Sequence, residues 1–218
     1  MRVLGIDPSL TAFGWAVIDD SFPQGDPRRC EDHGRFQTPS EMEFVDRYIS
    51  MRESLRGLLQ RVKPEKVGIE HPIFNDLFSE GMYGLFLYSC EALKLEGADA
   101  VFWTPLQVKA RAREIIVRPK GWKMEKPDMV EAAKADTGIP RWNHNEADAY
   151  LVGLLSSRFW GFHDGVLQEG VLSPVEKNYF TKVRTYSRGA NAGKTLKTGM
   201  VFREDDRFFL WSQKRSDV

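Results

Sequence analysis

Two short apolar segments near the N-terminus constrain the fold more than any other feature of the sequence. The first is Arg2–Asp7, the second is Phe13–Ile18, and about five residues separate them. A link of that length joins two antiparallel strands, whereas a strand–helix–strand unit needs a much longer connection. We therefore predict that the chain opens with a β-hairpin.

Strand and helix patterns alternate after this hairpin. Arg35–Thr38 is a candidate third strand, following a polar stretch at residues 19–33 that we expect to be a loop. Two more strands are predicted at Lys66–Glu70 and Ala100–Trp103. Apolar residues at helical spacing predict helices at residues 40–64, 78–95, 105–114, 127–136 and 143–159. This order predicts an α/β fold with a mixed five-stranded sheet flanked by helices.

Local signals mark where the first helix begins and where the regular pattern ends. Ser40 is expected to begin the helix, because Glu43 follows it at capping-box spacing. The pattern weakens after residue 162, so we divide the chain into a domain at residues 1–162 and a C-terminal segment at residues 163–218. That segment is a small basic extension, rich in aromatic residues, with a predicted hairpin at residues 199–212.

The charges of the chain are unevenly distributed. The formal net charge is zero, which by itself argues against a nucleic-acid partner. Residues 105–126 nevertheless have a net charge of +5 and residues 177–218 have +6, so the rest of the chain has −11. This segregation is typical of a basic surface for a polyanion, although lysines and arginines that merely solvate helices would give the same counts.

Composition also bears on the compartment. No apolar run reaches the roughly 18 residues of a transmembrane helix, and the N-terminal segment turns polar too early for a secretory signal, so we expect no membrane partner. Cys30 and Cys90 form neither a CxxC zinc pair nor a disulfide framework. They fit a reducing compartment, and we expect a cytoplasmic protein.

Three acidic residues occupy positions where α/β proteins assemble sites. Asp7 and Glu70 each end an apolar strand, and Asp148 lies at the edge of the buried stripe of the last predicted helix. His144 and Asn145 lie one helical turn earlier on the same face. Converging carboxylates repel one another unless a cation neutralises them, and such ligands suit Mg²⁺ or Mn²⁺. Two ions about 3.5–4 Å apart could support hydrolysis of a phosphodiester, whereas each acid alone could be an ordinary turn or surface residue.

Four sequence blocks resemble, in order, those of the RuvC-type Holliday-junction resolvases of the ribonuclease H-like superfamily: GIDPSLTAFGWAVI, VGIEHPIF, TPLQVKARA with KMEKPDMVEAAKA, and NEADAYLVGLL. The resemblance covers residues 1–160 well and the tail loosely. It is strongest to short phage-encoded members, whose tails also end in an aromatic and basic hairpin. It implies a ribonuclease H-like fold and a divalent-metal-dependent endonuclease that cuts branched DNA. It further implies a homodimer, located in the host cytoplasm if phage-encoded.

The resemblance also implies a metal-binding set. The chain matches three of the family's four acidic positions: Asp7, Glu70 and Asp148. The fourth position falls on Asn145 or His144, and neither is acidic. Asn145 would offer an uncharged oxygen and His144 a nitrogen, which leaves metal affinity and preference open. Glu146 would contribute only if the helix were distorted.

A second implied set consists of basic and aromatic residues that contact DNA. Lys109 and Lys126 match basic residues that flank the family's active site, and Arg111 and Arg113 lie close to Lys109 in sequence. Phe74 approximately matches the position where the family inserts a side chain at the branch point. Cations interleaved with aromatics suit unstacked bases, and the remaining predicted contacts are Lys120, Trp122, Lys123, Lys182, Arg184 and Arg188.

Three other functions compete with this interpretation. A kinase or actin-like ATPase would use Asp7 and residues 9–14 as a phosphate loop, but the chain is too short for the duplicated domain of those proteins. A broader flap, fork or hybrid nuclease of the same fold fits the sequence. A catalytically weak DNA-binding protein fits as well, because the fourth acid is missing.

Overall fold

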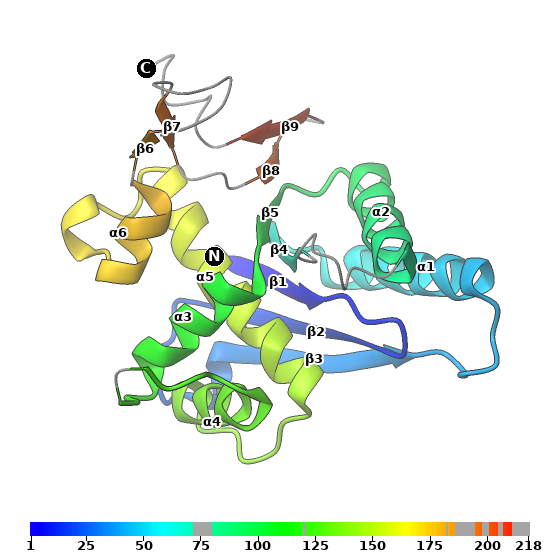
Figure 1. Ribbon diagram of the computed structural model, residues 1–218, viewed down its shortest axis with the longest axis horizontal. Helices are drawn as coiled ribbons and strands as arrows, with labels where there is room; N and C mark the ends of the chain where they lie inside the picture. The colour runs from blue at the N-terminus through cyan, green and yellow to red at the C-terminus, as the bar shows by residue number, and fades with distance from the viewer. Residues whose placement is uncertain are drawn as a thin grey trace.

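The computed structural model describes residues 1–71, 80–119, 121–181, 183–185, 195–197, 201–204 and 207–210. Within these residues the main sheet has seven strands in the order β3-β2-β1-β4-β5-β8-β9 (Figure 1). The strands are β1 (Arg2–Asp7), β2 (Ala12–Asp19), β3 (Cys30–Gln37), β4 (Lys66–Glu70), β5 (Ala100–Trp103), β8 (Val201–Glu204) and β9 (Arg207–Leu210). Strands β1, β4 and β5 are parallel, and the other neighbouring pairs are antiparallel. The predicted five-stranded mixed sheet is confirmed, and the hairpin β8–β9 extends it at β5.

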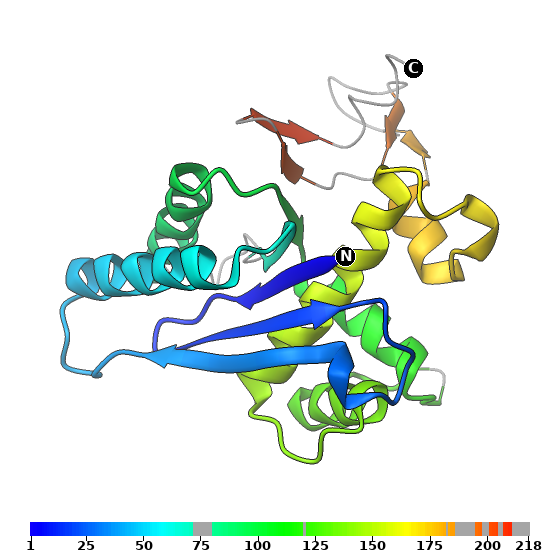
Figure 2. The same cartoon turned by 180° about the vertical axis from the view of Figure 1, so that it is seen from behind.

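Helices cover both faces of this sheet. They are α1 (Phe44–Val62), α2 (Glu80–Leu95), α3 (Pro105–Ile115), α4 (Lys126–Thr137), α5 (His144–His163) and α6 (Pro174–Phe180). Figure 1 shows α1 and α2 on one side of the sheet and α3, α4 and α5 on the other, and Figure 2 shows β1, β2 and β3 crossing in front of α5. Two short 3-10 turns, η1 (Pro27–Arg29) and η2 (Glu169–Val171), and a separate ladder of β6 (Val183–Thr185) with β7 (Thr195–Lys197) complete the described elements.

The two helical layers give the protein two hydrophobic cores. Side chains of β2 alternate between them: Ala16 and Ile18 pack on the α5 side, while Trp15 and Val17 pack on the α1 side. Each face of the sheet is therefore buried, which explains why the central strands read as short, nearly continuous apolar runs.

Glycines bring α5 into direct backbone contact with the sheet. One lies on each of β1, β2 and β4: Gly5, Gly14 and Gly68. A Cβ atom at Gly5 would lie 2.0 Å from the carbonyl oxygen of Ala149, and one at Gly14 would lie 2.2 Å from that of Asn145. No side chain larger than hydrogen fits between these backbones, so the first half of α5 is held against the ends of β1 and β2.

The structure corrects the sequence predictions at several boundaries. Strand β3 begins at Cys30, inside the stretch predicted to be a loop, and α1 begins at Phe44 rather than Ser40. The short helix α6 was not predicted, and it brings Leu172 and Phe180 into the core on the α5 side. The division of the chain at residue 162 stays a prediction. Among the described helices, none is both long and apolar enough to cross a membrane.

Candidate active site

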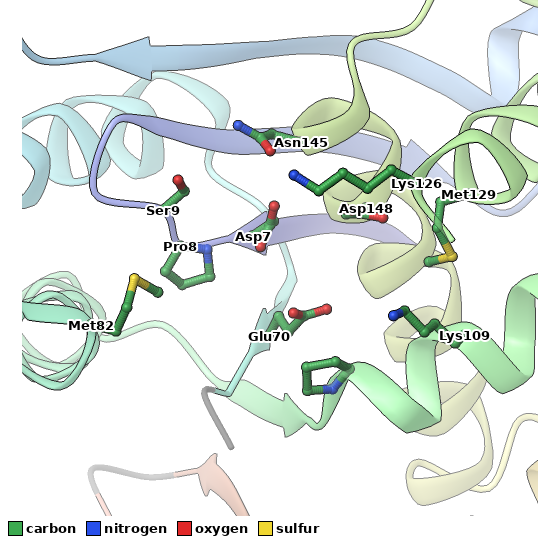
Figure 3. A pocket seen from close by; sticks show the side chains of 11 residues that line it. Asp7, Pro8, Ser9, Glu70, Met82, Lys109, Lys126, Met129, Asn145 and Asp148 are labelled. Carbon is green, nitrogen blue, oxygen red and sulfur yellow. The ribbon is translucent and has the colours of Figure 1, made fainter. Parts of the chain in front are cut away.

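The ends of β1 and β4 and the first turns of α5 surround a pocket of about 290 Å³. In the ladder between these parallel strands Ile6 pairs with Ile69, so Asp7 and Glu70, the last residues of the two strands, lie side by side at one edge of the sheet. Asp148 on α5 lines the same pocket, and Figure 3 shows the three carboxylates around one space. The structure therefore brings together the three acids that were singled out in the sequence.

These carboxylates have no neutralising partner. Within the described residues none of the three makes an ion pair or a hydrogen bond, and Oδ1 of Asp148 is buried without a hydrogen-bond partner. Burial raises the pKa of Asp7 well above its usual range, and the charges of Glu70 and Asp148 raise it further. Burial, with a contribution from Asp148, raises the pKa of Glu70 to about 8. Burial likewise raises the pKa of Asp148 to about 6.

Two lysines line the pocket but do not neutralise it. Lys109 comes from α3 and Lys126 is the first residue of α4, and Figure 3 shows both ammonium groups directed toward the acids. Against the effect of burial, both lysines lower the pKa of Asp148. With three acids and two lysines among its lining residues, the fully ionised pocket keeps a net negative charge.

The donor set fits a divalent ion, although not as a preformed cage. Among the described residues, no three His, Cys, Asp or Glu side chains are close enough together to hold one ion. Mg²⁺ is usually bound by one or two carboxylates, with water and substrate phosphates as its other ligands. The carboxylates of Asp7 and Glu70, whose pKa values are raised, and the buried unpaired Oδ1 of Asp148 are hard oxygen donors. They match that mode of binding.

The structure distinguishes the three candidates for the fourth position. Asn145 lines the pocket, its Nδ2 donates to the carbonyl oxygen of Ala12 at 2.5 Å, and Figure 3 shows its amide oxygen on the side of Asp7. His144 lines a neighbouring groove instead. Glu146 is turned away and pairs with Nδ1 of His33 at 2.9 Å.

The environment of His144 differs from that of the acids. Burial lowers its pKa, and the positive charges of Lys126 and Arg35 lower it further. The lowered pKa favours the neutral imidazole, and His144 lies outside the pocket that Asp7, Glu70 and Asp148 line.

Two arginines predicted to contact DNA make contacts with other parts of the chain. The guanidinium of Arg111 pairs with Glu114 at 3.0 Å and approaches Glu176 at 3.8 Å. Arg113 donates to the carbonyl oxygen of Trp122 at 2.6 Å. Arg111 and Glu114 have the i,i+3 spacing of a helical ion pair, whereas no sequence pattern indicated the contact with Glu176, which lies far along the chain.

The loop between α3 and α4 presents two other predicted contacts. Trp122 is 47% exposed, while its Nε1 donates to Asp128 at 3.1 Å, and Lys123 beside it is exposed. Of the remaining predicted contacts, Phe74, Lys120, Lys182 and Arg188 lie outside the described residues. Arg184 lies in β6, where only the backbone is described.

Other residues of the pocket were not predicted. They are Pro8, Ser9, Met82, Pro105 and Met129. Pro8 and Ser9 follow Asp7 directly, so the predicted end of the strand at Asp7 could have indicated that both line the pocket. The methionines lie on apolar helix faces, where nothing in the sequence separates a pocket residue from a core residue.

The chain is similar to known proteins over most of its length. No protein-family model matches it. It is 30% identical over 172 residues to the crossover junction endodeoxyribonuclease RuvC of Halothermothrix orenii, covering 74% of this chain and 98% of that protein. It is 27% identical over 157 residues to the RuvC of Ruminiclostridium cellulolyticum, covering 71% of this chain and 90% of that protein.

Two solved structures from Thermus thermophilus share the fold. RuvC alone matches with a TM-score of 0.59 and 19% identity, covering 75% of this chain and 97% of that one. RuvC in complex with a Holliday junction substrate matches with a TM-score of 0.57 and 22% identity, covering 71% and 91%. These similarities confirm the architecture that the sequence blocks implied.

Proposed function

The chain belongs to the RuvC family of crossover junction endodeoxyribonucleases, and from this premise we propose that it resolves Holliday junctions as a divalent-metal-dependent endonuclease. The relative from Halothermothrix orenii supports the assignment, because the alignment covers 98% of that protein. The observation in this structure that carries the proposal is the pocket where Asp7, Glu70 and Asp148 meet unpaired.

We assign two Mg²⁺ or Mn²⁺ ions to this pocket. Asp7, Glu70 and Asp148 would hold them, and the amide oxygen of Asn145 would add a neutral ligand. Bound ions would activate water and stabilise the leaving oxygen of the phosphodiester. Because Asn145 brings no charge, binding is expected to be weaker than with a fourth carboxylate. His144 is assigned to DNA rather than to metal, since it lines the neighbouring groove.

The lysines of the pocket orient the substrate. Lys109 and Lys126 reach it from two different helices, so they can hold the phosphate between them and fix its position relative to the acids. Trp122 and Lys123 are proposed to contact DNA next to this phosphate. Arg111 and Arg113 support the α3 region through internal contacts instead. Phe74, Lys120, Lys182, Arg184 and Arg188 stay predictions.

Several finer assignments belong to the same proposal. A Holliday junction is cut on two strands, so we propose a homodimer that provides one pocket for each cut. The aromatic and basic character of residues 177–218 supports a relationship to phage-encoded members. Two free cysteines support a cytoplasmic location, which is the host cytoplasm for a phage protein.

The test is cleavage of a synthetic four-way junction with Mg²⁺ or Mn²⁺, beside linear and forked duplexes. Symmetric paired nicks in the junction, with little cutting of the other DNAs, are expected. Equal cutting of forks would favour the broader nuclease, and binding without cleavage would favour a DNA-binding protein. The mass in solution, measured in parallel, tests the homodimer.

We propose that the tail is an additional DNA-binding arm. The structure shows where to truncate it: Leu172, Glu176 and Phe180 are buried, so a chain ending at Gly170 would lose part of its core. A chain ending after Thr181 keeps these residues. It is expected to bind the junction more weakly while binding divalent ions normally, and unchanged junction affinity would contradict the arm.

A further inference from the structure

The basic residues around the pocket fall into two groups, according to whether the protein already uses their charge. Arg111 is paired with Glu114, and Arg118 is paired with Asp128 and Glu131. In contrast, within the described residues the side chains of Lys126 and Lys134 make neither an ion pair nor a hydrogen bond. Positive charge that the fold does not neutralise is available to an external anion.

These available lysines line a second hollow, which we call the α4–α5 groove. It has a volume of about 610 Å³ and adjoins the acid pocket, since Lys126 lines both. The residues of the groove lie on α4 and at the start of α5: Lys126, Pro127, Val130, Glu131, Lys134, Trp142, Asn143 and His144. A ligand that leaves the acid pocket past Lys126 therefore enters the groove.

One more cation, Arg35, lies near this groove, since its charge lowers the pKa of His144, which lines the groove. In the β2–β3 ladder Arg35 is directly opposite Gly14, and Gly14 packs against the backbone of Asn145 in α5. Side chains of directly opposed residues project from the same face of a sheet, so Arg35 projects on the α5 side, beside the start of that helix. Arg35 is exposed and, in the described part of the chain, has no ion-pair partner.

The acidic residue of the groove does not cancel this charge. Glu131 lines the groove, but its carboxylate is bound by the guanidinium of Arg118. The groove as a whole therefore presents unneutralised cations, whereas the pocket beside it presents unneutralised acids. A long anion could lie along the cations of the groove while its reacting group, together with a divalent ion, occupies the acid pocket.

The spacing of the lysines indicates the length of that anion. Lys126 and Lys134 are eight residues apart on α4, which is about 12 Å at a rise of 1.5 Å per residue. Side chains that extend away from the helix at these two positions reach separate phosphates. A DNA strand advances about 3.4 Å per nucleotide along the duplex axis, so on a duplex whose axis runs along α4 the two lysines are about three to four nucleotides apart.

We propose that the α4–α5 groove binds the sugar–phosphate backbone of the DNA strand that is cut, with Lys134 and Arg35 contacting phosphates a few nucleotides from the cleaved bond. This inference rests on the proposed function and deepens it, since it gives the strand a direction away from the acid pocket.

The test measures how junction affinity depends on salt. Lys134→Gln, Arg35→Gln and the double variant are made in an Asp7→Asn background, so that binding is followed without cutting. The plot of log affinity against log salt concentration should become shallower by about 0.9 for each phosphate that the variant no longer neutralises, and by about twice that in the double variant. Lys94→Gln, which changes an exposed lysine on α2, is the matched control and should leave the slope unchanged. Unchanged slopes in both single variants would overturn the proposal.

A second measurement separates this proposal from the proposed function. Phosphate ethylation on the junction should interfere with binding at the cleaved bond and again a few nucleotides away, and Lys134→Gln should abolish only the more distant interference. A protein that shows both interferences but does not cut the junction would contradict the proposed function and support the groove. A protein that cuts normally and shows no distant interference would contradict the groove alone.

Discussion

The buried carboxylate of Glu176 and the buried carboxylates of the pocket have pKa values shifted in opposite directions. Glu176 is 1% exposed, and Arg158 donates to its two oxygens at 2.8 and 3.0 Å while the backbone N–H of Ser173 donates at 2.9 Å. Burial alone would raise the pKa of Glu176, but the hydrogen bonds from Arg158 and Ser173 outweigh it, and the pKa is lowered. At Asp7 and Glu70 the same burial acts without such partners, and both pKa values are raised.

The contrast separates an acid that stabilises packing from the acids of the candidate site. The fold can supply partners to a buried carboxylate when the carboxylate stabilises packing, as it does between α5 and α6 at Glu176. Leaving three adjacent acids without partners costs stability, and such sites persist where they serve a function. The unpaired acids are thus the structural basis of the proposed metal site.

The largest expected effect is on cleavage. Asp7→Asn should slow junction cutting by about a thousandfold or more, because it removes a proposed metal ligand and with it several kcal/mol of transition-state stabilisation. The same change removes a buried charge that repels Glu70 and Asp148, so thermal stability should stay equal or rise. Single-turnover cleavage and thermal unfolding measure the two effects. Asp46→Asn, on an exposed acid of α1, is the control, and an Asp7→Asn variant that still cuts would refute the metal assignment.

A loss of stability is expected when the paired acid, Glu176, is changed. Glu176→Gln should lower the free energy of unfolding by about 3 kcal/mol, because it leaves Arg158 without its buried counter-charge. Glu131→Gln is the matched control: its carboxylate is 53% exposed, and the loss should stay below about 1 kcal/mol. Urea unfolding measures both. Equal losses in the two variants would remove the distinction between the buried pair and a surface pair.

Divalent ions should stabilise the protein through the unpaired acids. At an ion concentration about one hundred times the dissociation constant, the free energy of unfolding should rise by about 2.7 kcal/mol. The Asp7→Asn variant should gain much less, while Glu176→Gln should gain as much as the unaltered chain. Thermal shifts with and without Mg²⁺ give the comparison. A full gain in Asp7→Asn would place the ion elsewhere.

A smaller effect is expected from pH. The pKa values of Glu70 and Asp148, about 8 and about 6, are above those of the unfolded chain, so the folded protein holds more protons in this range. Without divalent ions, stability should therefore fall as pH rises from about 4 to about 8. Glu176 acts in the other direction: its stabilisation is present above its unfolded pKa and is lost as pH falls through its lowered folded pKa. Urea unfolding across this range should show a weaker fall for Asp7→Asn, and parallel curves would contradict the raised pKa values.

Much of the fold could be predicted from apolar patterning. Strands at Arg2–Asp7, Lys66–Glu70 and Ala100–Trp103 have the predicted bounds. Only the end of strand β3 was predicted, within Arg35–Thr38, because the strand lies at the edge of the sheet and most of its side chains are at least partly exposed. Its pairing with β2 depends on backbone hydrogen bonds, which leave no apolar signal in the sequence.

The start of α1 shows how a side chain within the helix competes with a capping signal before it. Ser40 and Glu43 have the spacing of a capping box, yet the helix begins at Phe44. Nη2 of Arg47 donates to the carbonyl oxygens of Pro39, Ser40 and Met42, which satisfies these acceptors in a non-helical conformation.

The candidate site likewise contains residues that the sequence could predict and residues that it could not. Strand ends and helix periodicity were enough to select Asp7, Glu70 and Asp148 as neighbours. Which cations remain available could not be read from the sequence, because the partner of Arg111 on α6 is brought close only by tertiary packing. Lys134 and Arg35 could not be selected from the sequence for the same reason. Their proposed role rests on the absence of an ion-pair partner in the described residues, and only the folded structure shows this.

The hairpin β8–β9 also affects the tendency of the protein to aggregate at high concentration. By pairing with Ala100 and Val101, β8 covers the outer backbone of β5 and moves the sheet edge to β9, a strand of four residues. Exposed backbone at a sheet edge is a template for pairing with other molecules, and short edge strands limit this. A chain without the hairpin would present β5 to its neighbours, so the tail protects the sheet against aggregation.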